Sequence, residues 1–254
     1  MNHPPSATLR GGRQVAAPMS GAVSDLSARM ILDSRGNPTV EVDCYVNGVL
    51  RGRAAVPSGA STGSYEAVEL RDGGSDWVGR GVTLAITNVN GEIHDALIGM
   101  EVSDQEGIDT TLVTLDGTAN KSRLGANAIL GASMACLRAA SSGPLWAHIA
   151  ANGPSSLPVP QMNILNGGAH AASNVDVQEF MVVPHGFDSL PEALRAGVET
   201  YHALKSVLKE EGLLGGVGDE GGFAPNLPCN EDGLRHVLGA IERAGYTPGE
   251  QISI

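Results

Sequence analysis

The chain has 254 residues, 42% of them hydrophobic, which is enough for one large domain or two smaller ones with buried cores. Its 16 basic and 28 acidic residues give a formal net charge of -12, which disfavours nucleic acid and anionic membranes as partners. An acidic substrate would therefore need a local counter-charge such as a metal ion. No apolar run approaches the roughly 20 residues that cross a bilayer, so no membrane span is predicted.

The start of the chain and its cysteines indicate a compartment. Residues 1–24 are rich in proline, serine, glycine and alanine and are predicted to be a disordered extension, with Met19 as an alternative start. They lack a basic segment followed by an apolar one, so no signal peptide is predicted. Cys44, Cys136 and Cys229 are far apart and form no CxxC pair, which predicts free thiols in a reducing compartment. We expect a cytoplasmic protein, and a cell-surface or secreted pool stays open.

A β-hairpin is predicted after this extension. Residues 39–46 alternate apolar and polar side chains, which predicts a half-buried strand. Asn47-Gly48 then forms a strong hairpin signal, and residues 49–56 return as an antiparallel strand. The small-residue loop 58–63 follows. It is either a linker or a mobile lid whose hydroxyls and carbonyls could meet a cation or a phosphate.

Helical periodicity dominates residues 65–149. The clearest helix spans 127–140, where larger apolar side chains form a stripe and alanine and glycine dominate the remaining positions, which suits close helix packing. A hairpin followed by helices predicts a small α+β domain over residues 25–150, and the glycine, proline and serine cluster at 153–156 predicts a boundary near 150. The stripe consists of Ile129, Leu130, Met134 and Leu137.

The second domain, residues 151–254, is predicted to open a barrel. Short apolar runs at 159–165 and 177–183 are typical of buried strands. Helices are predicted at 190–211 and 231–244, and a further strand begins at 251–254. The order strand, strand, helix, helix, strand predicts the beginning of an α/β barrel.

An acidic loop at residues 218–225 is the strongest candidate for a site. Asp219 and Glu220 lie between glycines and are followed by Phe223 and Pro225. The glycines allow positive φ and close approach, while the proline excludes helix before it. The loop is either a tight acidic surface turn or a functional site. Two other polar, glycine-rich loops upstream, each next to an apolar strand, favour a site.

Five segments together resemble the enolase family, in the order and approximate spacing that the family uses. The resemblance implies an α+β N-terminal lid domain followed by an (α/β)8 barrel with a ββαα start. It also implies a hydro-lyase, phosphopyruvate hydratase, that reversibly dehydrates 2-phosphoglycerate to phosphoenolpyruvate in glycolysis and gluconeogenesis with two Mg²⁺ ions. Family members usually dimerise through the lid domain. The segments are LDSRGNPTVEV at 32–42, PSGASTG at 57–63, MNILNGGAH at 162–170, QEF at 178–180 and GDEGGFAP at 218–225.

The resemblance also implies roles for five residues. Glu220 would be the general acid that assists departure of the 3-hydroxyl, with a pKa raised by neighbouring carboxylates. Glu179 would be its partner near that hydroxyl, and Gln178 would contact the substrate. His170 would close over the substrate, and Ser61 would bind the second Mg²⁺ through its hydroxyl and carbonyl.

Without the resemblance, the residues allow structural interpretations in place of these functional roles. His170 could be a satisfied loop histidine, and Glu179 could be a solvated strand end. Strand alternation would put Gln178 and Glu179 on opposite faces, unless a bulge or the end of the strand reconciles them.

The predicted barrel is incomplete. A full barrel needs about 250 residues, more than twice the stretch 151–254. No residue in the sequence matches the family's acidic ligands for the catalytic Mg²⁺, its lysine base, or the second lysine and arginine that hold the substrate. We therefore expect no turnover from the isolated chain, and aggregation or dependence on a complementing C-terminal half. A non-catalytic remnant or interaction scaffold, and a relative acting on another carboxylate, are the alternative functions. Whether the truncation is biological or an artefact stays open.

Overall fold

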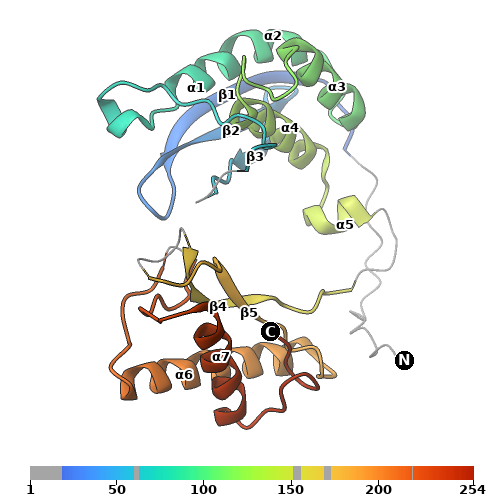
Figure 1. Cartoon of the computed structure of the whole chain (residues 1–254). Helices are drawn as coiled ribbons and strands as arrows, with labels where there is room; N and C mark the ends of the chain where they lie inside the picture. The colour runs from blue at the N-terminus through green and yellow to red at the C-terminus, as the bar shows by residue number, and fades with distance from the viewer. Residues whose placement is uncertain (1–18, 60–62, 151–155, 169–172, 219) are drawn as a thin grey trace. The chain divides into compact units, whose positions relative to one another are not determined.

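The computed structural model describes residues 19–59, 63–150, 156–168, 173–218 and 220–254. The chain forms two compact units, and the boundary between them falls between Gly153 and Pro154. Each unit has a sheet and helices of its own (Figure 1). The two units are therefore described separately.

The first unit is built on a three-stranded antiparallel sheet in the order β1-β2-β3. Its strands are β1 (Val23–Leu32), β2 (Pro38–Val46) and β3 (Val49–Ala55). The predicted hairpin is confirmed, and its turn places Asn47 at φ 52° and Gly48 at φ 75°, the positive values that a two-residue hairpin needs. The predicted disorder of residues 1–24 is wrong at its end, because β1 begins at Val23. Antiparallel pairing with β2 stabilises that segment.

Both faces of β2 are covered, so the predicted half-buried strand is too simple. Val40, Val42 and Cys44 are 0% exposed on one face. On the other face Asp43 is only 3% exposed. Two arginines of the neighbouring strands cover it, and their nitrogens lie 2.8 Å and 2.6 Å from its carboxylate oxygens. A polar residue in an alternating strand is therefore buried by its ion pairs.

The helices of the first unit follow the sheet in sequence. The region 83–97 is nearly continuous helix with a π-helical segment inside it. The predicted helix at 127–140 is confirmed as α4, which packs against β2 and β3. The elements are η1 (Asp76–Gly79), α1 (Thr83–Asn88), η2 (Val89–Ile93), α2 (His94–Leu97), α3 (Gln105–Asp116), α4 (Ala126–Ala140) and α5 (Leu145–Ala150).

The close packing expected of the alanine and glycine positions of α4 is confirmed, and these positions are buried more deeply than the apolar stripe. Leu130 is 41% exposed, and the other three residues of the predicted stripe are only partly buried. The helix instead turns its small residues toward the sheet, because they let its backbone approach the strands closely. A Cβ atom on Gly52 of β3 would lie 2.0 Å from the carbonyl oxygen of Ala135. The buried residues of α4 are Asn127, Ala128, Gly131, Ala132, Ala135, Cys136, Ala139 and Ala140.

The second unit has the predicted element order. Antiparallel strands β4 (Met162–Asn166) and β5 (Glu179–Val182) are followed by helices α6 (Leu190–Glu210) and α7 (Asn230–Arg243). Ser253 then makes an isolated antiparallel bridge to Val183, within the segment 251–254 where a strand was predicted to begin. Within the described residues the sheet has two strands and no barrel closes, so the predicted incomplete barrel is confirmed.

The core of the second unit lies between this sheet and the two helices. α6 and α7 pack together, and α7 contacts both strands. The Ser189 side chain caps α6 by accepting a hydrogen bond from the backbone N–H of Glu192. The long apolar run that a bilayer crossing requires is not found in any described helix. The largest fully buried side chains of this unit are Leu165, Leu204, Leu208, Phe223, Leu227, Ile241 and Ile252.

Candidate active site

The candidate site is built around Asn166, the last residue of β4, which has partner backbone on both sides. On one side, its N–H donates to the carbonyl of Phe223 at 2.8 Å, and the N–H of Phe223 donates to the carbonyl of Ile164 at 2.9 Å. On the other side, Asn166 is paired with Glu179 in the register of β4 and β5. The acidic loop that carries Glu220 and the strand that carries Glu179 therefore flank the same strand end.

Glycines allow the acidic loop to approach this closely. A Cβ atom on Gly222 would lie 1.9 Å from the side-chain oxygen of Asn166, so no larger residue fits without displacement. Gly221 has φ +85°, in the region that favours glycine. Gly222 and Phe223 are buried, whereas Glu220 is exposed. The loop is thus held by its backbone while its acidic side chain is left accessible.

The loop after β4 contacts Gln178 through the backbone. The N–H of Gly167 donates to the carbonyl of Gln178 at 3.0 Å, and a Cβ atom on Gly168 would lie 2.9 Å from the carbonyl of Asp176. β5 begins at Glu179, so Gln178 precedes the strand. The alternation of side chains within β5 therefore does not apply to Gln178 and Glu179, because Gln178 lies outside the strand. This is one of the two arrangements that the sequence left open. The roles of Gln178, Glu179 and Glu220 stay predictions.

Two asparagines under the site were missed by our sequence analysis. The side-chain nitrogen of Asn163 donates to the side-chain oxygen of Asn166 at 2.9 Å. Among the described residues, no partner is found for the other amide atom of either side chain, although both atoms are buried. An unpaired buried polar atom costs about 1–3 kcal/mol and calls for an explanation, such as a bound water, an ion or a functional role. The signal was available, because two asparagines interrupt an apolar strand.

Three predicted positions lie outside the described residues. They are Ser61, His170 and Asp219. For the loop at 58–63, the structure therefore describes only the residues before position 60 and after position 62.

Arg35 holds the beginning of that loop, a contact that our sequence analysis did not anticipate. Its guanidinium donates to the carbonyls of Ser58 at 2.9 Å and Gly59 at 3.4 Å. The arginine lies in the turn between β1 and β2. Asp33 shapes this turn by accepting hydrogen bonds from the N–H groups of Arg35 and Asn37, both at 2.8 Å. The bond from Asn37 is the largest cause that lowers the pKa of Asp33.

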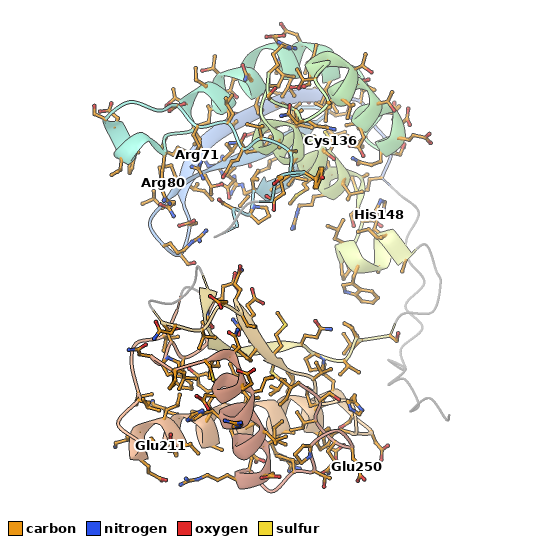
Figure 2. The ribbon with its side chains drawn as sticks, in the orientation of Figure 1. Arg71, Arg80, Cys136, His148, Glu211 and Glu250 are labelled. Carbon is orange, nitrogen blue, oxygen red and sulfur yellow. The ribbon has the colours of Figure 1, made fainter. Side chains whose placement is uncertain are left out.

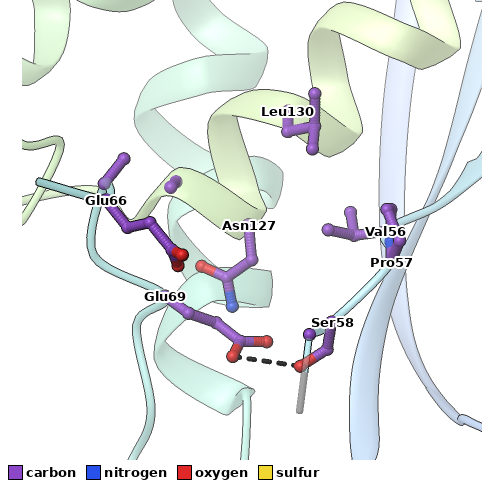
Figure 3. Close-up of a pocket in the computed structure, with 10 residues that line it drawn as sticks. Val56, Pro57, Ser58, Glu66, Glu69, Asn127 and Leu130 are labelled. Atoms are coloured by element: carbon purple, nitrogen blue, oxygen red, sulfur yellow. Dashed lines mark hydrogen bonds between the residues drawn. The ribbon is translucent and has the colours of Figure 1, made fainter. Parts of the chain in front are cut away.

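Arg71 holds the side chains next to the same segment. It donates to Glu69 at 2.6 Å and to the carbonyl of Pro38 at 2.6 Å. The hydroxyl of Ser58 donates to the other oxygen of Glu69 at 3.2 Å, the dashed line in Figure 3. Ser58 and Glu69 border a hollow of about 280 Å³ that is also lined by Asn127 and Leu130 (Figure 3). The hollow lies wholly within the first unit.

The described residues do not form a metal site. They contain no group of three or more histidine, cysteine, aspartate or glutamate side chains that could hold an ion. The Mg²⁺ that enolases generally use is therefore not matched by a ligand set in this part of the chain, and no chemical step through the metal follows from the geometry.

Two family models match the chain in sequence order. The model described as "Enolase, N-terminal domain" matches residues 23–149. The model described as "Enolase, C-terminal TIM barrel domain" matches residues 154–254. These matches coincide with the sheet-and-helix unit and with the open two-stranded unit that bears Glu179 and Glu220. The chain belongs to the enolase family, whose enzymes are lyases, and in its described residues the barrel domain does not close.

Proposed function

We propose that this chain carries the acid side of an enolase active site, which catalyses the reversible dehydration of 2-phosphoglycerate to phosphoenolpyruvate. The observation that supports this best is the arrangement at Asn166. Its backbone N–H bonds to the acidic loop on one side, and its strand partner on the other is Glu179. Both candidate carboxylates thus come from segments that meet at one strand end.

The reaction explains why carboxyl groups are needed there. Loss of the C2 proton leaves negative charge on the carbon next to a carboxylate, and the C3 hydroxyl must then leave as water. Glu220 would donate the proton to that hydroxyl. Glu179 would orient the same hydroxyl, and Gln178 would hydrogen-bond the substrate. The exposure of Glu220 is consistent with access to a small substrate.

The base is not supplied by the segments that carry these acids. The lysines of the sequence are Lys121, Lys205 and Lys209. Lys121 lies in the first unit, and the other two are exposed on α6. None lies on the strand or the loop that bears Glu179 or Glu220. We therefore infer that the chain acts together with a polypeptide segment that supplies the remaining barrel strands, the metal ligands and the base.

A coupled assay of phosphoenolpyruvate formation tests this proposal. The purified chain is incubated with 2-phosphoglycerate and Mg²⁺, alone and with a polypeptide that contains the later barrel strands of an enolase. We expect no turnover from the chain alone and measurable turnover from the mixture. Glu220→Gln should reduce the restored rate at least about 100-fold, because an amide cannot donate the proton.

The matched control is Glu250→Gln. Glu250 is an exposed glutamate of the same unit, and its replacement should leave the restored rate unchanged. Restored turnover that survives Glu220→Gln would contradict the proposed role of Glu220. Turnover by the chain alone that Glu220→Gln abolishes would support the reaction and refute the need for a second polypeptide. A folded mixture that never converts the substrate would favour an interaction scaffold.

A further inference from the structure

We propose that Cys44 and Cys136 form an oxidation site that converts reversibly to an intramolecular disulfide and links β2 to α4. The two sulfur atoms lie 3.9 Å apart, and both residues are 0% exposed. This pair lies in the core of the first unit, and the proposed dehydration does not use it. Figure 2 marks Cys136 on α4, where the helix lies against the sheet.

The contact has a structural cause in the close approach of α4 to the sheet. Gly52 of β3 is the register partner of Cys44. A Cβ atom on Gly52 would lie 2.0 Å from the carbonyl oxygen of Ala135, the residue before Cys136. Because Gly52 has no side chain, the backbone of α4 lies close to the sheet at the position of the two thiols. Since sulfur atoms in a disulfide are about 2 Å apart, the pair needs an approach of roughly 2 Å.

The environment makes the two thiols unequal. The Cys136 thiol donates to the sulfur of Cys44. This hydrogen bond lowers the pKa of Cys44, and the same bond together with burial raises the pKa of Cys136. The thiolate is the reactive form of cysteine. Cys44 is therefore the sulfur that attacks an oxidant, and Cys136 is the resolving thiol.

Hydrogen peroxide is the chemical class of oxidant that fits this buried pair, since the molecule is small. The sulfur of Cys44 takes one peroxide oxygen as the O–O bond breaks, which forms a sulfenic acid and releases one water. The sulfur of Cys136 then attacks that of Cys44, the S–O bond breaks, and the hydroxyl leaves with the thiol proton as a second water. The two thiols lose two electrons and two protons in total. The peroxide is reduced to two waters.

Cys229 provides an internal comparison. It is partly exposed, belongs to the other unit and donates to Asp232 at 3.3 Å. It occupies the N-cap position of α7, where serine is a preferred residue. Cys229→Ser is therefore expected to retain the fold and to leave only the buried pair for analysis.

The test uses the full Cys229→Ser chain treated with hydrogen peroxide. The protein is then unfolded with an alkylating reagent present, and its intact mass is measured. We expect the mass to fall by two hydrogen atoms and neither cysteine to be alkylated. Digestion should release one linked pair of peptides containing residues 44 and 136. Treatment with dithiothreitol before alkylation should restore two reactive thiols.

Two controls make the outcome decisive. In the wild-type chain, oxidation of Cys229 shows that the dose was sufficient. Cys136→Ala adds one more alanine to a face of α4 that is already rich in alanine, and it should abolish the intramolecular link. The proposal is wrong if both thiols stay alkylatable at a dose that oxidises Cys229. It is also wrong if Cys44 proceeds to sulfinic acid without a link, or if the chains become joined to one another.

Discussion

The two units of this chain bury their sheets to different extents. The first unit has three strands paired along their lengths, and the central strand β2 is covered on both faces. The second unit has two short strands, and the next contacts along its sheet are single-residue bridges at Phe223 and Ser253. Backbone groups at the edges of an unfinished sheet are open to pairing with further strands. In the described residues, the sheet of the first unit is therefore the more fully paired of the two.

The two helices of the second unit also carry exposed apolar side chains. Each helix has two of them one turn apart, on a face that its own unit does not cover. Their exposed fractions range from 41% to 50%. The residues are Leu194 and Val198 on α6, and Leu234 and Leu238 on α7.

The largest effect that we predict is a difference in local stability between the two units. Amide hydrogens of β2 should exchange at least about 100-fold more slowly than those of β4 and β5, a difference of roughly 3 kcal/mol in the free energy of opening. The reason is that β2 has strand partners on both edges and cover on both faces. Hydrogen exchange followed by mass spectrometry measures this directly.

Aggregation provides a second readout of the same contrast. The apparent mass measured by light scattering should rise with protein concentration, and it should fall when a polypeptide that supplies further barrel strands is added. A monodisperse monomer that melts in one cooperative transition, with equal protection in both sheets, would contradict the comparison.

The next largest effect is expected at the close contact between β3 and α4. Gly52→Ala would place a methyl group 2.0 Å from the carbonyl oxygen of Ala135, so the helix must move away from the sheet. We expect the first unit to lose about 2–3 kcal/mol of its free energy of unfolding, measured by denaturant titration.

Gly239→Ala is the control in the second unit. Gly239 lies inside α7, and nothing lies within 4 Å of an added Cβ atom. Alanine should therefore stabilise that helix by about 0.5–1 kcal/mol through its higher helix propensity. If both variants lost the same free energy of unfolding, the contact at Gly52 would not be the cause of the loss.

The smallest effect concerns acid stability. Hydrogen bonds from Arg53 and then Arg29 lower the pKa of Asp43 from 3.8 to about 2. Because the folded pKa lies below the unfolded one, this stabilisation is fully present above pH 3.8 and is lost as the pH falls toward 2. We expect a contribution of about 1–2 kcal/mol, since both arginines are partly exposed to solvent.

Unfolding of wild type and Asp43→Asn between pH 2 and 7 checks this prediction. The variant should be less stable at pH 7 and should lose less stability on acidification. Asp95→Asn, at a carboxylate that is 82% exposed, should change stability by less than about 0.5 kcal/mol. An unchanged acid slope in Asp43→Asn would contradict the assignment.

Much of the element order could be predicted from the sequence, because its signals are local. The turn at Asn47-Gly48 fixes the hairpin, and the spacing of apolar residues identifies α6 and α7. The acidic loop was recognised from its composition. What could not be predicted depends on partners that are distant in the chain. Asp43 is buried because arginines of two other strands reach it, and no pattern within its own strand records that.

Which face of α4 is buried most deeply depends on a distant partner too. Hydrophobicity favours the face with Ile129 and Leu130, but the sheet selects the face that allows the closest backbone approach. The contacts of Arg35 and Arg71 with Ser58 and Glu69 were missed because long polar side chains carry no periodic signal. At the site itself, the sequence identified Glu179 and Glu220 as candidates, and the geometry adds that their segments flank Asn166.

The contact between Gly222 and Asn166 has a mechanical consequence. Both the N–H and the carbonyl of Phe223 make main-chain hydrogen bonds to β4. There is no space for a side chain between Gly222 and Asn166. These contacts hold the acidic loop against the end of the strand. If a further segment pairs with this sheet, as we propose, its docking would also fix the position of Glu220, the proposed proton donor.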